Sequence, residues 1–270
     1  MWILYSILGV FGLFLAVILI RAALFNPKQA YKISSQSVDF DGKAATDALQ
    51  ALIRCKTVSN VDPALEDDAE FNKLIDLLPG LYPKVFETCE FQKLPDRGLL
   101  FRWPGESSTA PSVMMAHYDV VPADEEKWDK PPFDGIIEDG VLWGRGTLDT
   151  KATFNGALFA ANTLIGQGYR PKNDIYLAFS GGEEVNGAGA DNIVDYFVQH
   201  GIQPALVLDE GGAVVENVFP GVKQPCGLIG IAEKGMMNVE YKVRQNWSKS
   251  LFSSEAQGGR LLAAIKAKQT

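Results

Sequence analysis

The sequence predicts an α/β fold built on a layered sheet, and two observations lead to this prediction. Short apolar runs alternate with longer segments whose apolar side chains recur at helical spacing, and glycine and proline residues separate the two kinds of segment. The apolar runs carry few polar residues, which is typical of strands that helices cover on both faces. We therefore expect a largely buried sheet with helices packed against it.

The first half of the chain predicts two helices followed by three strands. Apolar residues at Ala45, Leu49, Leu52 and Ile53 give 41–55 the pattern of an amphipathic helix. A second helix is expected around four apolar residues at i, i+3, i+4 and i+7, with a proline–glycine pair at its end: Phe71, Leu74, Ile75, Leu78 and Pro79-Gly80. Strands are expected at 85–91, 99–103 and 113–116.

The second half predicts a regular alternation of helix and strand. The expected elements are a helix at 151–167, a strand at 175–179, a helix at 191–199 and a strand at 205–208. His200 stands just before Gly201, where the last of these helices ends, so we interpret it as a structural residue.

The first twenty residues do not belong to this fold. No side chain from Trp2 to Ile20 is charged, and about 20 apolar residues are enough to cross a bilayer as a helix. A cleaved signal peptide would begin with a basic segment, which is absent here, so we favour a retained anchor over 1–25 and a polar linker over 26–40. Basic residues after the span favour a cytoplasmic location for the rest of the chain, and the orientation stays open.

Composition narrows the class of function. The 270 residues carry a formal net charge of −8, which argues against nucleic-acid binding because that function needs a basic face. The three cysteines, Cys55, Cys89 and Cys226, show no CxxC spacing. Buried free thiols are the favoured interpretation, and a Cys55–Cys89 disulfide is the alternative.

Possible metal ligands gather where the predicted strands end. The strands ending near 116, 179 and 208 run into such residues, and a further acid precedes the helix at 151: His117 and Asp119, Glu183 and Glu184, Asp209 and Glu210, and Asp149. The carboxyl ends of strands form the ligand-binding edge of an open α/β sheet. Converging carboxylates repel one another, and divalent cations remove that repulsion. One imidazole among many oxygens suits zinc, manganese or cobalt better than calcium.

The spacing of these residues indicates how they share the chemistry. His117 and Asp119 are two residues apart, so they share a face of a strand and the carboxylate could orient a histidine ligand. Neighbouring glutamates point in different directions. One of Glu183 and Glu184 could therefore bind metal while the other acts as a base.

Several ordered motifs resemble the M20 family of metallopeptidases, most of all its carboxypeptidase S and N-acyl-amino-acid hydrolase branch. The resemblance extends from about Leu49 to about Val243. It rests on the stretches 115–122, Trp128 with 131–133, 143–146 with Asp149 and Lys151, 182–184 with Gly187 and Gly189, and 208–212. It implies a phosphorylase/hydrolase-like layered-sheet catalytic domain over 41–226. It also implies the start of an inserted α+β dimerisation domain over 227–270.

The resemblance further implies two metal ions, usually Zn²⁺, with Co²⁺ or Mn²⁺ as alternatives. His117, Glu184 and Glu210 would each bind one ion, and Asp149 would bridge both. Asp209 competes with its neighbour Glu210 for the last of these roles.

Two more roles follow from the resemblance, and two family features have no counterpart. Asp119 would orient His117, and Glu183 would act as the general base toward the attacking water. The family's Gly-Gly-His turn and its last histidine ligand are missing, because His117 and His200 are the only histidines. We therefore expect a chain that is truncated relative to the family.

These expectations describe a zinc-dependent hydrolase that cleaves C-terminal amide bonds of small peptides or N-acyl amino acids. The family points to a membrane-tethered protein whose catalytic domain lies outside the cytoplasm or in a lumen, and to a homodimer in the full-length form. One alternative is a deacetylase or deacylase of an N-acylated biosynthetic intermediate. The other, from a different class, is an inactive remnant that binds metal weakly.

Overall fold

The structure is a computed structural model that describes residues 2–24, 39–218 and 220–231. The chain divides into two units, Met1–Asp47 and Ala48–Thr270. Most of the linker expected at 26–40, and most of the inserted-domain start expected at 227–270, lie outside the described residues.

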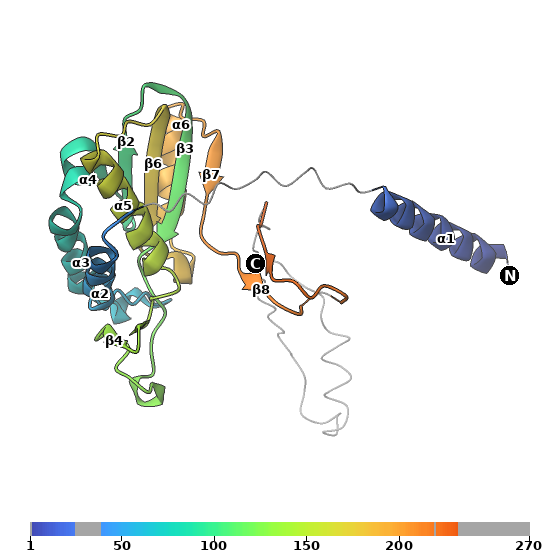
Figure 1. The fold of residues 1–270 in the computed structure, drawn as a ribbon, viewed down its shortest axis with the longest axis horizontal. Coiled ribbons are helices and arrows are strands. Elements are labelled where there is room, and N and C mark those ends of the chain that lie inside the picture. Colours follow the sequence, from blue (N-terminus) through green and yellow to red (C-terminus); the bar gives the residue numbers. More distant parts are fainter. Residues whose placement is uncertain (1, 25–38, 219, 232–270) are drawn as a thin grey trace, which may run out of the picture. The chain divides into compact units, whose positions relative to one another are not determined.

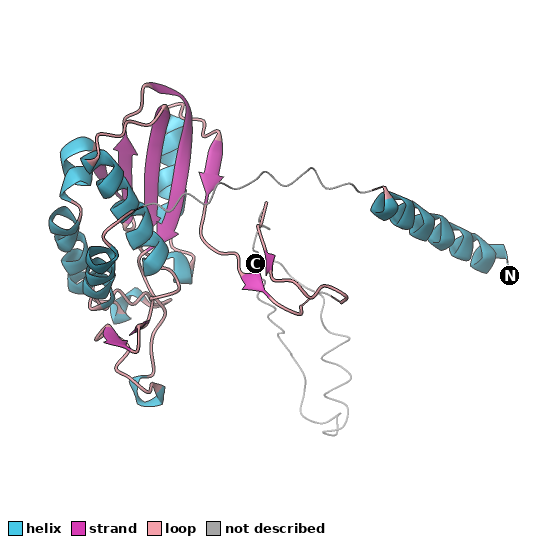
Figure 2. Ribbon diagram, in the orientation of Figure 1, coloured by secondary structure: helices cyan, strands magenta, loops and turns pink. Residues whose placement is uncertain are grey.

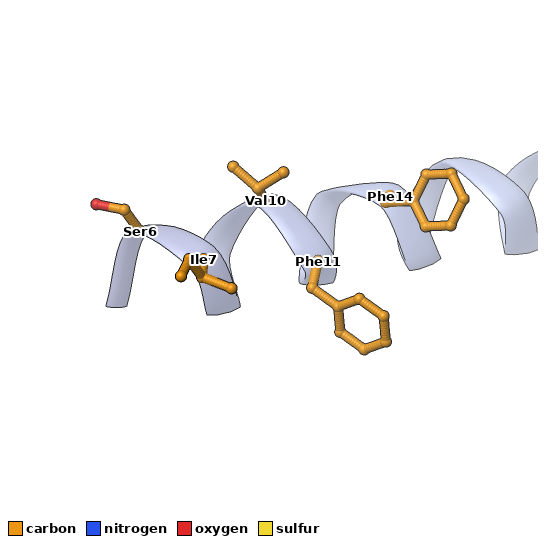
Figure 3. A pocket seen from close by; sticks show the side chains of 5 residues that line it. All are labelled: Ser6, Ile7, Val10, Phe11 and Phe14. Carbon is orange, nitrogen blue, oxygen red and sulfur yellow. The ribbon is translucent and has the colours of Figure 1, made fainter. Parts of the chain in front are cut away.

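The first unit contains α1, Trp2–Ala23, a helix of 22 residues that is long and apolar enough to cross a membrane. Its side chains are exposed, and five of them line an apolar hollow on its surface: Ser6, Ile7, Val10, Phe11 and Phe14 (Figure 3). A signal sequence near an amino terminus also forms such a helix. The helix is therefore a candidate membrane span by length and composition only.

The second unit is built on a five-stranded sheet in the order β1-β2-β6-β3-β7 (Figures 1 and 2). The strands are β1 Glu90–Leu94, β2 Gly98–Trp103, β3 Ser107–His117, β6 Asn173–Ser180 and β7 Leu206–Leu208. β3 runs parallel to β6 and β7, whereas β2 is antiparallel to β1 and β6. The carboxyl ends of β3, β6 and β7 therefore meet at one edge of the sheet, and the α/β prediction is confirmed.

Helices cover the sheet on both faces. The carboxyl-terminal part of α2 (Gly42–Ile53) packs on one face with α3 (Asp68–Leu81), α4 (Pro83–Thr88) and α5 (Lys151–Gly166), and α6 (Gly189–Gln199) packs on the other. Phe154 of α5 meets Phe179 of β6 with ring centroids 4.5 Å apart. Across the sheet, Phe197 of α6 meets Tyr176 of β6 at 5.1 Å. Alternate side chains of β6 thus enter two separate cores, as expected for a strand buried on both faces.

Shorter elements lie outside the main sheet. They are the hairpin of β4 (Ile136–Glu138) and β5 (Val141–Trp143), the pair β8 (Val214–Val215) and β9 (Cys226–Gly227), and the 3₁₀ turns η1 (Pro63–Leu65), η2 (Glu125–Lys127) and η3 (Glu183–Val185). The β4–β5 hairpin belongs to the long connection between β3 and α5 (Figure 1). Asp149 lies near the end of this connection, two residues before α5.

The structure corrects two predicted boundaries. Residues 85–88 lie in α4 and the strand begins only at Glu90, because Pro83 stands in the first turn, where proline favours a helix start. α3 continues past Pro79 to Leu81. A proline in the last turn removes only one intrahelical bond, and the Tyr82 amide still donates to the Leu78 carbonyl oxygen at 2.8 Å.

The expectation of a buried sheet is wrong for β7. Leu206, Val207 and Leu208 are 57%, 52% and 55% exposed. Among the described residues β7 is an edge strand that pairs only with β3. Its apolar composition therefore predicted a strand correctly but not the burial of that strand.

Two glycines give opposite predictions for substitution by alanine. A Cβ at Gly181 would lie 2.5 Å from Cζ of the buried Tyr118 ring, so Gly181→Ala should lower the free energy of unfolding by about 1–3 kcal/mol. A Cβ at Gly156, inside α5, meets nothing within 4 Å, so Gly156→Ala should raise it by about 0.5–1 kcal/mol. Urea unfolding measures both changes. Shifts of the same sign would contradict the packing described here.

The three cysteines are free, so the alternative of a Cys55–Cys89 disulfide is not realised. Burial raises the pKa of the Cys55 thiol and raises that of Cys89 to about 12. Because the thiolate is the reactive form, we expect iodoacetamide at neutral pH to label Cys226 and to spare the two buried thiols until the chain unfolds. Peptide mass spectrometry of the labelled folded protein checks this, and early modification of Cys89 would contradict it.

Candidate metal centre

The candidate ligands meet at the carboxyl edge of β3, β6 and β7. His117 is the last residue of β3, and Glu183 and Glu184 lie in η3, two glycines beyond β6. Asp149 stands two residues before α5, and Glu210 two residues after β7. Parallel strand direction, rather than proximity along the chain, is what brings these segments together.

Two overlapping groups of ligand atoms surround His117. Its Nε2 lies 3.1 Å from Asp149 Oδ1, 3.2 Å from Glu210 Oε1 and 3.7 Å from Glu183 Oε2. One ligand atom each from His117, Asp149 and Glu184 lie within 4.8 Å of one another, and the same holds for His117, Glu183 and Glu210. One imidazole and four carboxylates thus share a space of the size that divalent cations need.

Asp119 is fully buried next to this cluster, and it contacts both His117 and the turn that carries Glu183 and Glu184. Its Oδ1 accepts the Glu183 amide at 3.1 Å and lies 3.4 Å from His117 Nδ1. Its Oδ2 accepts the Glu184 amide at 3.2 Å and the Ser59 hydroxyl at 2.6 Å. His117 Nδ1 is closer still to the Asp119 carbonyl oxygen, at 3.1 Å, so the backbone and the side chain of Asp119 both face this nitrogen.

The electrostatics of the cluster favour a bound cation. Burial alone would lower the pKa of His117, but its hydrogen bonds and ion pairs with Asp119 and Glu210 raise that pKa to about 11. Burial raises the pKa of Glu183, and Glu210 raises it further against the opposing effect of His117. Burial and then Asp149 raise the pKa of Glu184. The carboxylates stabilise the protonated form of His117, and Glu183 and Glu184 resist ionisation beside other negative charges. A divalent cation would take the place of the proton on His117 and would stabilise the ionised carboxylates.

The structure distinguishes the two acids that follow β7. Glu210 is half-buried beside His117 and also hydrogen-bonds Thr150. Asp209 is exposed, and its Oδ1 accepts the Glu210 amide at 2.8 Å. His200 lies at the end of α6, where its Nδ1 is 2.8 Å from the Tyr196 carbonyl oxygen, in keeping with its interpretation as structural.

Ser59 and Thr150 contact the site although the sequence patterns do not single them out. Ser59 lies in the loop after α2 and reaches Asp119 across 60 positions of sequence. Thr150 follows Asp149 directly and is 2% exposed. A buried hydroxyl beside a charged site carries no periodic signal. Only its place within a motif could have pointed to Thr150, and nothing local pointed to Ser59.

Residues 113–268 match the family described as Peptidase family M20/M25/M40. The chain belongs to this family. The matched stretch includes every candidate metal ligand from His117 to Glu210. It also includes β6, β7 and the carboxyl-terminal part of β3, and the carboxyl ends of these strands form the site.

Relatives of this M20 chain carry names that refer to amide chemistry. It is 34% identical over 244 residues to the human protein "N-fatty-acyl-amino acid synthase/hydrolase PM20D1", covering 88% of this chain and 48% of that protein. It is 32% identical over 243 residues to "Probable carboxypeptidase S-like 2" of Dictyostelium discoideum, covering 85% and 47%. The chain thus spans about half the length of the curated relatives it matches.

Solved structures of M20 peptidases share the fold. An M20 family metallo-carboxypeptidase, Sso-CP2 from Sulfolobus solfataricus, superposes with a TM-score of 0.51 and 22% identity, over 66% of this chain and 39% of that one. Human carnosine dipeptidase 1 gives a TM-score of 0.53 and 16% identity, over 64% and 40%. At these identities the similarity supports the fold alone.

Proposed function

We propose that the full-length protein is a metal-dependent hydrolase that cleaves the amide bond of N-acyl amino acids or the C-terminal amide bond of small peptides. The observation that carries this proposal is the convergence of His117 with four carboxylates at one sheet edge, in a chain of the M20 family. The names of the relatives, an N-fatty-acyl-amino acid hydrolase and a carboxypeptidase S-like protein, support this class of substrate.

His117, Asp149, Glu184 and Glu210 are the proposed ligands of two Zn²⁺ ions, with Asp149 as the bridge, and Co²⁺ or Mn²⁺ would suit the same donors. When bound, the ions supply a Lewis acid for the amide carbonyl and lower the pKa of water at the site. Asp119 holds the imidazole of His117 in the orientation that such a ligand needs.

Glu183 is the proposed general base. Its side chain is 53% exposed, so water can reach it, and its backbone is tied to Asp119. Burial is the main cause of the raised pKa of Glu183, and a raised pKa suits a base that both accepts and releases a proton. It takes a proton from the attacking water and passes that proton to the leaving nitrogen.

We also propose an arrangement of the longer protein. Residues 41–226 form the amino-terminal part of the catalytic domain, and 227–270 begin an inserted dimerisation domain. α1 anchors the protein in a membrane, with the catalytic domain outside the cytoplasm or in a lumen. The apolar length of α1 supports the anchor.

Hydrolysis of three substrates by the full-length protein tests the function: a long-chain N-acyl amino acid, its N-acetyl counterpart and a dipeptide. We expect cleavage of the first or third, loss of cleavage on metal chelation and recovery with Zn²⁺. Preference for the N-acetyl compound would instead favour a deacetylase. A metal-loaded protein that cleaves none of the three would overturn the proposal and favour a non-catalytic remnant.

A further inference from the structure

We propose that Ser59 is a positioning residue of the metal centre, which acts through Asp119 on both His117 and the turn that carries Glu183 and Glu184. This inference rests on the proposed function only where kcat and KM are measured, because the Co²⁺ affinity and the Tm do not require a substrate. Its main observation is the hydrogen bond from the Ser59 hydroxyl to Asp119 Oδ2 at 2.6 Å. The two residues are 1% and 0% exposed, so water does not replace this donor.

Backbone hydrogen bonds hold the loop that carries Ser59 against the segment that carries Asp119. The Ser59 amide donates to the Val120 carbonyl oxygen at 3.1 Å, and the Val120 amide donates to the Thr57 carbonyl oxygen at 2.9 Å. Val58 and Val120 form a parallel β-bridge. The loop 57–59 thus pairs with the segment that carries Asp119, and this backbone pairing places Cα of Ser59 beside Asp119.

The start of the same loop is fixed by a buried lysine next to the site. Lys151 Nζ donates to the carbonyl oxygens of Leu52 at 3.0 Å and Cys55 at 2.8 Å, where α2 ends. Lys151 is fully buried and lies two residues after Asp149. The loop that carries Ser59 is therefore tied to two of the segments that carry candidate ligands.

The Ser59 hydroxyl matters because the two carboxylate oxygens of Asp119 contact different groups of the site. Oδ1 faces the Glu183 amide and His117 Nδ1, and Oδ2 faces the Glu184 amide and Ser59. Without the short Ser59 contact, Oδ2 keeps only the longer bond to Glu184. A carboxylate that then rotates displaces the imidazole and the glutamate turn together. Loss of such a supporting partner typically costs about 10–100-fold in metal affinity or activity.

The chain offers a matched control for a purely structural role. Thr57 is two residues from Ser59 in the same loop and is 0% exposed. Its Oγ1 donates to the Tyr118 carbonyl oxygen at 2.6 Å. Thr57→Val removes a buried hydroxyl hydrogen bond of the same length from the same loop, and it leaves the Asp119 carboxylate untouched.

The test compares Ser59→Ala and Thr57→Val with wild type in the full-length protein. Co²⁺ affinity is measured by competition with a chromophoric chelator, the Tm of the metal-free protein by calorimetry, and kcat and KM on the cleaved substrate. We expect Ser59→Ala to weaken Co²⁺ binding by about 10–100-fold and to lower kcat more than it raises KM. Thr57→Val should lower the Tm at least as much while keeping Co²⁺ affinity within about two-fold of wild type.

Unchanged Co²⁺ affinity in Ser59→Ala would overturn the inference, and so would an equal loss of affinity in Thr57→Val. The metal titration also separates this inference from the proposed function. If wild type binds Co²⁺ but cleaves no substrate, the hydrolase proposal fails and the titration still decides the role of Ser59. A full-length wild-type protein that binds no Co²⁺ would overturn both.

Discussion

Glu183→Gln in the full-length protein is expected to retain its metal and to lose about 10²–10⁴-fold in kcat. Glutamine has the size of glutamate but cannot accept the proton of the attacking water. The hydrogen bond that fixes this turn to Asp119 is donated by the backbone amide of Glu183 and survives the substitution. Metal content by atomic emission and kcat on the cleaved substrate measure the two effects separately.

The metal measurement in that variant is informative because Glu183 lies close to the candidate ligands. Its Oε2 is 3.7 Å from His117 Nε2, and it forms a ligand-sized group with His117 and Glu210. Glu184→Gln is the matched control and should lose an ion as well as turnover. If Glu183→Gln loses metal and Glu184→Gln keeps it, the roles of the two glutamates are exchanged. Substantial turnover by Glu183→Gln would exclude it as the base.

Asp149→Ala should bind less metal than wild type and show no measurable turnover. As the proposed bridge, Asp149 would give each ion one oxygen ligand and offset part of the repulsion between the ions, so its loss would weaken the binding of both. The Asp149 side chain is 73% exposed, so the folded chain itself should tolerate the change within about 0.5 kcal/mol. Metal stoichiometry after dialysis, combined with unfolding of the metal-free protein, checks both statements.

A conservative variant sharpens this prediction. Asp149→Asn keeps one oxygen ligand and the size of the side chain but loses the negative charge. We expect it to hold metal more weakly than wild type and more strongly than Asp149→Ala. A fully metal-loaded Asp149→Ala protein would refute the bridging role, and an unstable metal-free variant would show that Asp149 supports the fold instead.

The sequence alone was sufficient for the alternation of helices and strands and for the segments that end in possible ligands. Helical and strand periodicities are local properties, because each depends on residues a few positions apart. Strand ends are also local, so His117, Glu183 and Glu184 could be placed at a common edge once the sheet was expected. The apolar run that forms α1 needed nothing more than its own composition.

Local context explains where the sequence prediction of elements failed. Val85 and Phe86 suit a strand by residue type, yet Pro83 starts a helix there and Val85 packs into the core from it. The sequence also gives no local indication that β2 is antiparallel to β1 and β6, because an apolar strand has the same residue pattern whichever way it pairs. Packing against neighbouring elements decided both features.

Only the tertiary structure places Glu210 rather than Asp209 beside His117, and only it brings Ser59 to Asp119. Neighbouring acids after a strand have the same composition and the same distance from it, and the path of the chain beyond β7 turns one toward His117 and the other to solvent. Ser59 and Asp119 are 60 residues apart. Their contact depends on the pairing of the loop 57–59 with Val120, just beyond β3. Such long-range pairing is set by the folded backbone and has no periodic pattern in the sequence.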